Sequence, residues 1–217
     1  MPFPSALPHP PLLGADFYAL PTLEASRALL GQLLYCETPG GGAHLLRIVE
    51  TEAYRQDDPA CHAYRRKAGR AAMLYEAPGT AYVYFIYGMY DCLNVVSDPV
   101  DTAGAILIRA VEPLPGPDGQ VPDLRTNGPS RLCKALGIRV ATHNGLCLRD
   151  PASPLRLLQG APIANERMLA TTRIGISKGV DLPWRFYERG NPFVSVLAPE
   201  DPDRKRRPRR QALRPEA

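Results

Sequence analysis

The chain has 217 residues, a length that suits one large domain or two small ones, and we expect a single domain. With 45% hydrophobic and 22% charged residues it has the composition of an ordinary globular protein, which excludes a disordered or fibrous chain. The formal net charge is +4, and residues 201–217, with seven basic and three acidic side chains, supply all of it.

The two ends of the chain differ in composition from its centre. Residues 1–11 are rich in proline and predict a flexible arm, and residues 12–200 are expected to form the folded domain. The block of arginine and lysine within residues 201–217 repels itself and predicts a disordered tail. Such a block releases counterions from a polyanion, so nucleic acid is the expected partner, with a merely solubilising or targeting tail as the alternative.

Neither a membrane segment nor a metal site is expected. The sequence shows no secretion signal and no run of about 18 apolar residues, which predicts a cytoplasmic protein, associated with the nucleoid in a bacterium or nuclear in a eukaryote. The five cysteines form no C-x-x-C pair and lack close histidines, so we expect reduced thiols, no metal and no cofactor.

The predicted elements follow one another in an order typical of an α+β fold. A helix is expected over residues 22–31 and a second over 127–137, each closed by a glycine. Strands are expected over 32–37, 45–54, 81–86, 89–97 and 105–112, with shorter β-like pieces at 173–177 and 193–196. We therefore predict a single domain with a curved, mostly antiparallel β-sheet flanked by helices, from which a β-hairpin protrudes.

Two carboxylates lie two positions apart on the strand expected at residues 45–54. Alternation places Glu50 and Glu52 on the same face as Leu46, Ile48 and Tyr54. A carboxylate on an apolar face needs a partner or a proton, and sites that use a general base keep one in such surroundings. The alternative is that these side chains face solvent or neutralise an arginine.

Arg109 lies within the apolar strand expected at residues 105–112. A buried guanidinium without a partner is strongly disfavoured, so we expect Arg109 to meet Glu50, Glu52 or a bound phosphate. The alternative is a side chain that reaches water from the end of the strand.

Residues 82–90 contain four of the ten tyrosines, and a glycine near their centre allows a tight turn. The segment predicts a hairpin with Tyr87, Gly88 and Met89 at its tip. An exposed aromatic residue at a hairpin tip is suited to insertion between stacked bases, whereas an ordinary core or dimer hairpin is the alternative. The long polar loop over residues 55–70 contains His62, which is either functional or an ordinary surface residue.

Taken in order, these segments resemble the alkyladenine (3-methyladenine) DNA glycosylase family over roughly residues 12–197. The matching motifs are RIVETEAY at 47–54, DPACH at 58–62, PGTAYVYFIYGM at 78–89, CLN at 92–94, LIRAVEP at 107–113, NGP at 127–129, RIGI at 173–176 and WRFY at 184–187. The resemblance implies a monofunctional DNA repair glycosylase, which flips an alkylated purine such as 3-methyladenine out of the duplex and hydrolyses its N-glycosidic bond. It also implies that the protein binds double-stranded DNA containing alkylated or deaminated purines and begins base excision repair. We expect a monomer, since one flipped base needs one pocket.

Carried over onto this sequence, the resemblance makes Glu52 the general base that activates water for attack on C1′ of the flipped nucleotide. Arg109 and the backbone carbonyl near Ile174 would help to hold that water. The residues that would line the base pocket are Tyr54, His62, Tyr84 and Asn94, of which Asn94 would crowd the exocyclic amine of normal guanine. Tyr87, with Gly88 and Met89, would fill the gap left in the duplex.

The sequence departs from the family pattern next to His62. The spacing from Tyr54 to His62 is one residue shorter than in some members, and a T-x-R-N-like segment is replaced by residues 68–73. These differences bear on the width of the pocket and on the range of lesions.

Three other functions are compatible with the same residues. A bifunctional glycosylase would also nick the strand through an amine such as that of Pro2 after removal of Met1. A non-catalytic DNA-damage-binding protein would use the hairpin and the basic tail alone. A glycosidase acting on carbohydrates fits less well, because Glu50 and Glu52 point in parallel and do not flank a bond from both sides.

Overall fold

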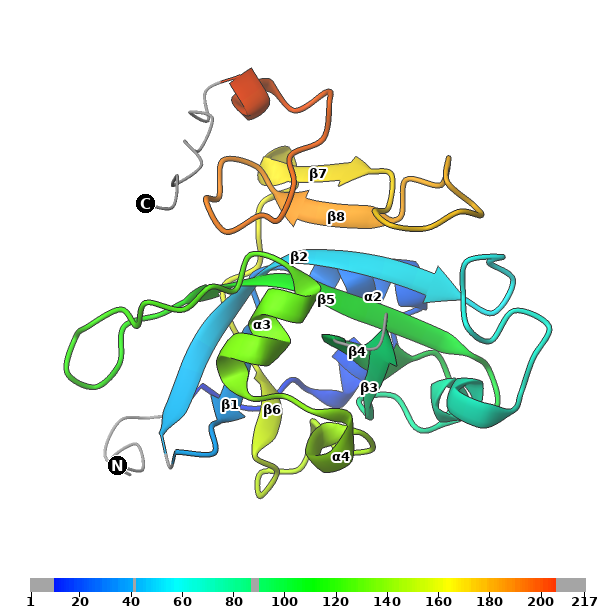
Figure 1. Cartoon of the computed structure of the whole chain (residues 1–217), viewed down its shortest axis with the longest axis horizontal. Coiled ribbons are helices and arrows are strands. Elements are labelled where there is room, and N and C mark those ends of the chain that lie inside the picture. The colour runs from blue at the N-terminus through cyan, green and yellow to red at the C-terminus, as the bar shows by residue number, and fades with distance from the viewer. Residues whose placement is uncertain (1–9, 41, 87–89, 206–217) are drawn as a thin grey trace, which may run out of the picture.

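A single antiparallel sheet organises the computed structural model, which describes residues 10–40, 42–86 and 90–205. Six of its eight strands follow the order β3-β4-β5-β2-β1-β6, and β7 joins them through β8, which pairs with both β2 and β7 (Figure 1). The strands are β1 (Leu33–Glu37), β2 (Ala43–Arg55), β3 (Ala81–Ile86), β4 (Tyr90–Ser97), β5 (Gly104–Pro113), β6 (Leu155–Leu158), β7 (Met168–Thr171) and β8 (Arg185–Glu188). The predicted α+β class with a mostly antiparallel sheet is confirmed.

Short helices cover the sheet. Two of them, α2 (Thr22–Ala28) and α3 (Pro129–Leu136), contribute buried side chains to the main hydrophobic core beside the aliphatic residues of β1, β2, β4 and β5. The remaining helices are α1 (Ala15–Tyr18), α4 (Val140–His143) and three 3-10 segments, Gly69–Tyr75, Asn165–Arg167 and Pro202–Lys205. The part of the chain that the structure describes contains no helix long and apolar enough to cross a membrane.

Most of the elements expected from the sequence are present. The helix α3 has proline at its first position and ends at Gly137 with φ +67°, which are the start and stop signals used to predict it. Strands β3 and β4 form the predicted hairpin, whose last described pair is Ile86 with Tyr90. The proposed tip residues Tyr87, Gly88 and Met89 lie outside the described residues, as do 1–9 of the expected arm and 206–217 of the expected tail.

The prediction of two short strands at 173–177 and 193–196 is wrong. Both segments are irregular, and the sheet is completed instead by β7 and β8. Gly175 has φ +79°, and the N–H groups of Ile174 and Ser195 donate to glutamate side chains rather than to a neighbouring strand. Apolar residues therefore occur in these segments without the ladder of backbone hydrogen bonds that a strand requires.

The prediction that Glu50 and Glu52 share a face of the strand with Leu46 and Ile48 is also wrong, because β2 and β5 are both bulged. Ile48 pairs with Val111 and Glu50 with Ala110, so Val49 is an extra residue on β2. The next pair is Thr51 with Ile108, so Arg109 is an extra residue on β5. An extra residue reverses the alternation of side chains, so Glu50 and Glu52 do not share the face of the preceding aliphatic residues.

The bulge also marks a change of neighbour along β2. Its first half pairs with β1 as far as Arg47, whereas Glu50, Thr51 and Glu52 pair with β8. Beyond the bulge, the hydroxyl of Thr51 bonds to Ser26 of α2. The helix therefore covers one face of this half of β2, which leaves the other face to Glu50 and Glu52.

The turn after α2 makes a close approach that only glycine allows. Gly31 has φ +85°, and an added Cβ would collide with the backbone oxygen of Ala161 and lie 3.2 Å from Ile163.

Gly31→Ala should therefore lower the free energy of unfolding by at least about 2 kcal/mol, as measured by urea denaturation. Gly14→Ala is the matched control, because Gly14 has φ −71° and an added Cβ meets nothing within 4 Å. Equal losses in the two variants would contradict this account of Gly31.

Candidate active site

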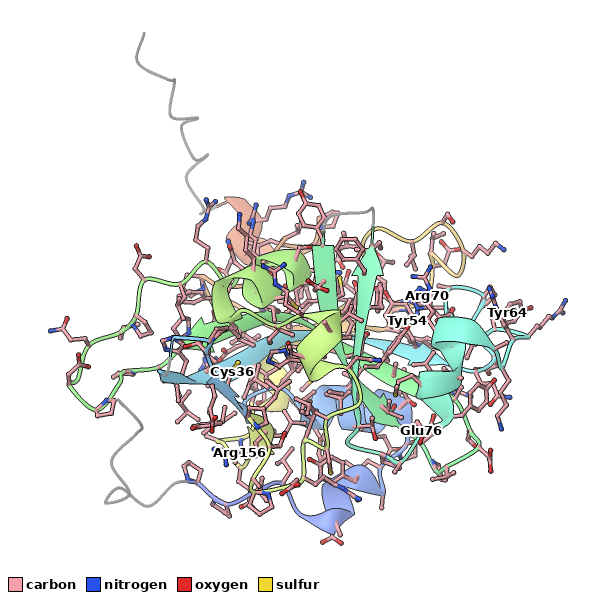
Figure 2. All side chains as sticks on the ribbon, turned by 60° about the horizontal axis from the view of Figure 1, so that its bottom comes forward. Cys36, Tyr54, Tyr64, Arg70, Glu76 and Arg156 are labelled. Carbon is pink, nitrogen blue, oxygen red and sulfur yellow. The ribbon has the colours of Figure 1, made fainter. Side chains whose placement is uncertain are left out.

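A cavity of about 640 Å³ opens between the β3–β4 hairpin, β5 and two loops. Six of the residues predicted for the site line this cavity, namely Tyr54, His62, Tyr84, Asn94, Arg109 and Ile174. Others were not anticipated from the sequence, among them Cys92, Leu107, Ser130 and Lys178. In Figure 2, Tyr54 and Arg70 lie on one side of the β3–β4 hairpin, whereas Cys36 and Arg156 lie on the other.

Glu52 lies beside this cavity and is completely buried. The hydroxyl of Tyr54 donates to Oε2 over 2.7 Å, and the N–H of Ile174 donates to Oε1 over 2.8 Å. Arg109 Nη1 lies 3.2 Å from the same Oε1. All three neighbours are donors, so they fix the orientation of a carboxylate that can only accept hydrogen bonds from them.

Arg109 connects Glu52 to the second carboxylate. Its Nε donates to Glu50 Oε1 over 3.2 Å, while Nη1 faces Glu52, so the predicted contact with an anion is made twice. Burial alone would lower the pKa of Arg109, but the charges of Glu52 and Glu50 outweigh it and raise the pKa. The guanidinium therefore remains positive between them.

Glu50 is occupied by structural contacts. Arg185 Nη1 donates to its Oε1 over 2.7 Å, the N–H of Ser195 donates to Oε2 over 2.7 Å, and the Ser195 hydroxyl contacts Oε1 at 2.9 Å. With Arg109 these contacts use both oxygens of Glu50. Neither carboxylate lines the cavity itself, but the three donors to Glu52, on Tyr54, Ile174 and Arg109, all do, whereas Arg109 is the one of these donors to Glu50 that does. Of the two carboxylates that the sequence left as candidates, Glu52 is therefore the one whose partners form the cavity wall.

Tyrosine and histidine rings form an aromatic wall. His62 Nδ1 lies 2.9 Å from the hydroxyl of Tyr82, and the His62 and Tyr84 rings meet edge to face at 4.7 Å between centroids. Burial, followed by the positive charge of Arg70, lowers the pKa of His62 below its usual value of 6.5. The imidazole is therefore neutral at pH 7, and because Nδ1 is bonded to Tyr82, Nε2 is the ring nitrogen left to form a hydrogen bond with a base.

The phenols of the cavity stay protonated. Burial, reinforced by the charge of Glu52, raises the pKa of Tyr54 well above its usual value, and burial likewise raises the pKa of Tyr84. Asn94 is fixed as well, because its amide nitrogen donates to the carbonyl oxygens of Tyr82 at 3.0 Å and Cys92 at 3.4 Å. The cavity thus presents polar groups on rigid supports.

Several residues around the site were missed. Arg185 and Ser195 belong to a segment more than 130 positions from Glu50, and Asp58 and Arg173 lie within matched motifs but had no role assigned. Among the residues that the structure describes, no group of three or more His, Cys, Asp or Glu side chains could hold a metal ion.

The two glutamates should differ in their effect on stability. Glu50→Gln leaves Arg185 without its buried anion and should cost about 3–5 kcal/mol of unfolding free energy. Glu52→Gln should cost clearly less, because Arg109 keeps its pairing with Glu50. Guanidinium denaturation of both variants measures the difference. A Glu50→Gln protein as stable as Glu52→Gln would show that Glu50 does not secure this part of the fold.

Comparisons with known proteins agree with this geometry. A family model described as methylpurine-DNA glycosylase matches residues 16–192. A protein of Salinibacter ruber named "Putative 3-methyladenine DNA glycosylase" is 44% identical over 208 residues, covering 86% of this chain and 98% of its own. Proteins of the same name from Carboxydothermus hydrogenoformans, 45% identical over 85% of this chain and 98% of theirs, and Prosthecochloris aestuarii, 42% identical over 88% and 95%, are similar too.

The match to the family model spans the strands and loops that line the cavity and includes the buried carboxylates Glu50 and Glu52. DNA is thereby identified as the substrate, and the enzymatic class is that of a DNA repair glycosylase. The chain belongs to the methylpurine-DNA glycosylase family.

Proposed function

We propose that this protein acts as a monomer on double-stranded DNA, from which it releases alkylated purines such as 3-methyladenine by hydrolysis. The observation that carries the proposal is Glu52, a buried carboxylate held by three donors at the edge of an aromatic cavity. The cavity has a volume of about 640 Å³, which lies within the range of small-ligand pockets, roughly 300–1,000 Å³.

The target base must leave the helix to reach this cavity. Unstacking costs a few kcal/mol and is least for damaged or mismatched bases, so lesions are preselected. Tyr87, with Gly88 and Met89, follows the last described residue of β3 and would fill the gap left in the duplex. The pocket would then hold the extruded base between Tyr54, His62 and Tyr84.

Hydrolysis follows from the position of Glu52. The carboxylate takes a proton from water as the water oxygen forms a bond to C1′, and the C1′–N bond breaks with its electron pair going to the base. An N3- or N7-alkylated purine is cationic, so it leaves as a neutral molecule without acid catalysis. The electron-rich faces of Tyr54 and Tyr84 attract such a cation, and Asn94 crowds the amine of normal guanine.

Glu52→Gln tests the assignment of the base. The amide cannot take the proton, so the single-turnover rate of 3-methyladenine release should fall by about 10²–10⁴ while binding to lesion-containing duplex persists. The control is Glu24→Gln, which changes an exposed glutamate of α2 and should keep the wild-type rate. Wild-type release by the Glu52 variant would remove this residue from the mechanism.

Lys178 is a candidate nucleophile for the alternative lyase activity, because this residue lines the cavity. An amine that attacked C1′ would form an imine that borohydride traps, followed by strand scission. We expect an intact abasic strand and no trapped adduct, since water activated by Glu52 is the nucleophile. A trapped adduct that disappears in Lys178→Ala would assign the lyase to Lys178, and one that persists would point to another amine such as that of Pro2.

A further inference from the structure

Asp58 and Arg173 form a buried ion pair beneath the cavity, and both side chains are fully shielded from solvent. Arg173 Nη1 pairs with Oδ2 of the carboxylate, and Nη2 donates to Oδ1 over 2.9 Å. Burial alone would lower the pKa of Arg173, but the hydrogen bonds and charge of Asp58 outweigh it and raise the pKa. We call this two-pronged pair the Asp58–Arg173 clasp.

The clasp joins the bases of the two loops that line the cavity. Asp58 directly precedes residues 59–62, all four of which line it, and Arg173 directly precedes residues 174–178, all five of which line it. The two loops lie side by side at the same end of the sheet in Figure 1. Neither member of the clasp lines the cavity itself.

The same guanidinium also fixes the second loop and the strand of Glu52. Nη2 donates to the carbonyl of Gly179 over 3.3 Å, so the two ends of the 174–178 loop are held together. Nη1 donates to the carbonyl of Ala53 over 2.9 Å, and the charge lies 4.6 Å from the centre of the Tyr54 ring. Arg173 therefore holds one loop directly and the other through Asp58, with β2 as the common reference.

Gly179 shows how closely this arrangement is packed. Its φ is +58°, and an added Cβ would lie 3.0 Å from Asp58 Oδ1 and 3.1 Å from Arg173 Nη2. A larger residue would thus push against both members of the clasp. Backbone and side chain approach each other here as closely as a glycine permits.

We propose that Asp58 and Arg173 are positioning residues that fix the separation of the 59–62 and 174–178 loops, and thereby the size of the purine that the cavity accepts. The part of this inference that concerns purines rests on the proposed function. The part that concerns coupling of the loops rests on the ion pair alone.

Hydrogen exchange tests the coupling without any substrate. Arg173→Lys keeps the charge but loses the fork, and Asp58→Asn keeps the shape but loses one acceptor and the charge. Because the clasp joins the loops, each variant should speed exchange by about tenfold or more in the loop that it does not belong to. The reporters are the N–H groups of Cys61 and Ile174, which are both hydrogen-bonded.

The control is Arg47→Lys. Arg47 also binds two carboxylates, those of Glu112 and Glu188, but lies outside the cavity lining. This variant should leave exchange in both cavity loops at the wild-type rate. If Arg173→Lys fails to fold, Asp58→Asn alone decides the result. Exchange that rises only in the substituted loop, or equally in the control, would overturn the coupling.

The size of the cavity is tested with two substrates that differ by one methylene group, duplex DNA carrying N-methylated or N-ethylated purines. The wild-type preference for methylpurines should fall by about tenfold in both clasp variants and stay unchanged in Arg47→Lys. Equal slowing on both substrates would reduce the clasp to a stabilising element. If the wild type released neither base, the proposed function would fail, while the exchange data would still decide whether the loops are coupled.

Discussion

Arg109 is held between two fully buried carboxylates, those of Glu50 and Glu52, and the elements around the cavity supply the contacts that stabilise these three charges. Removing a charged group from water costs several kcal/mol even after relaxation, so three such groups are tolerated only with near-complete hydrogen bonding. The paired bulges on β2 and β5 bring Arg109 between Glu50 and Glu52, and the C-terminal segment supplies Arg185 and Ser195. Geometry that satisfies these charges leaves Glu52 in one orientation beside the cavity.

Glu50 and Glu52 lie two positions apart on β2 but differ in their contacts and in the roles that these contacts support. Glu50 joins Arg109 to Arg185 and Ser195, which lie outside the cavity lining, whereas all three donors to Glu52 line the cavity. Arg109 touches both and links the stability of the fold to the orientation of the proposed base. Chemical type and spacing along the strand could not separate these roles, because they depend on partners distant in sequence.

Local signals in the sequence predicted the regular elements well. The residue alternation of β3 and β4 and the proline and glycine at the two ends of α3 act over a few positions and were sufficient. The faces of β2 were predicted wrongly, because a single unpaired residue, Val49, reverses the alternation and leaves no mark in composition. The resemblance supplied the pocket residues, but it assigned no role to Asp58, Arg173, Arg185 or Ser195, whose contacts exist only after folding.

The exchange of neighbours along β2 has a consequence for biosynthesis. Glu50 is translated 135 residues before Arg185 and 145 before Ser195, so during synthesis its carboxylate has neither partner. Arg109 and water are then the groups that can stabilise that charge until β8 has left the ribosome and docked. The half of β2 that bears Glu52 thus completes its sheet last, and an unfinished chain cannot bury its acidic strand or assemble a functional centre.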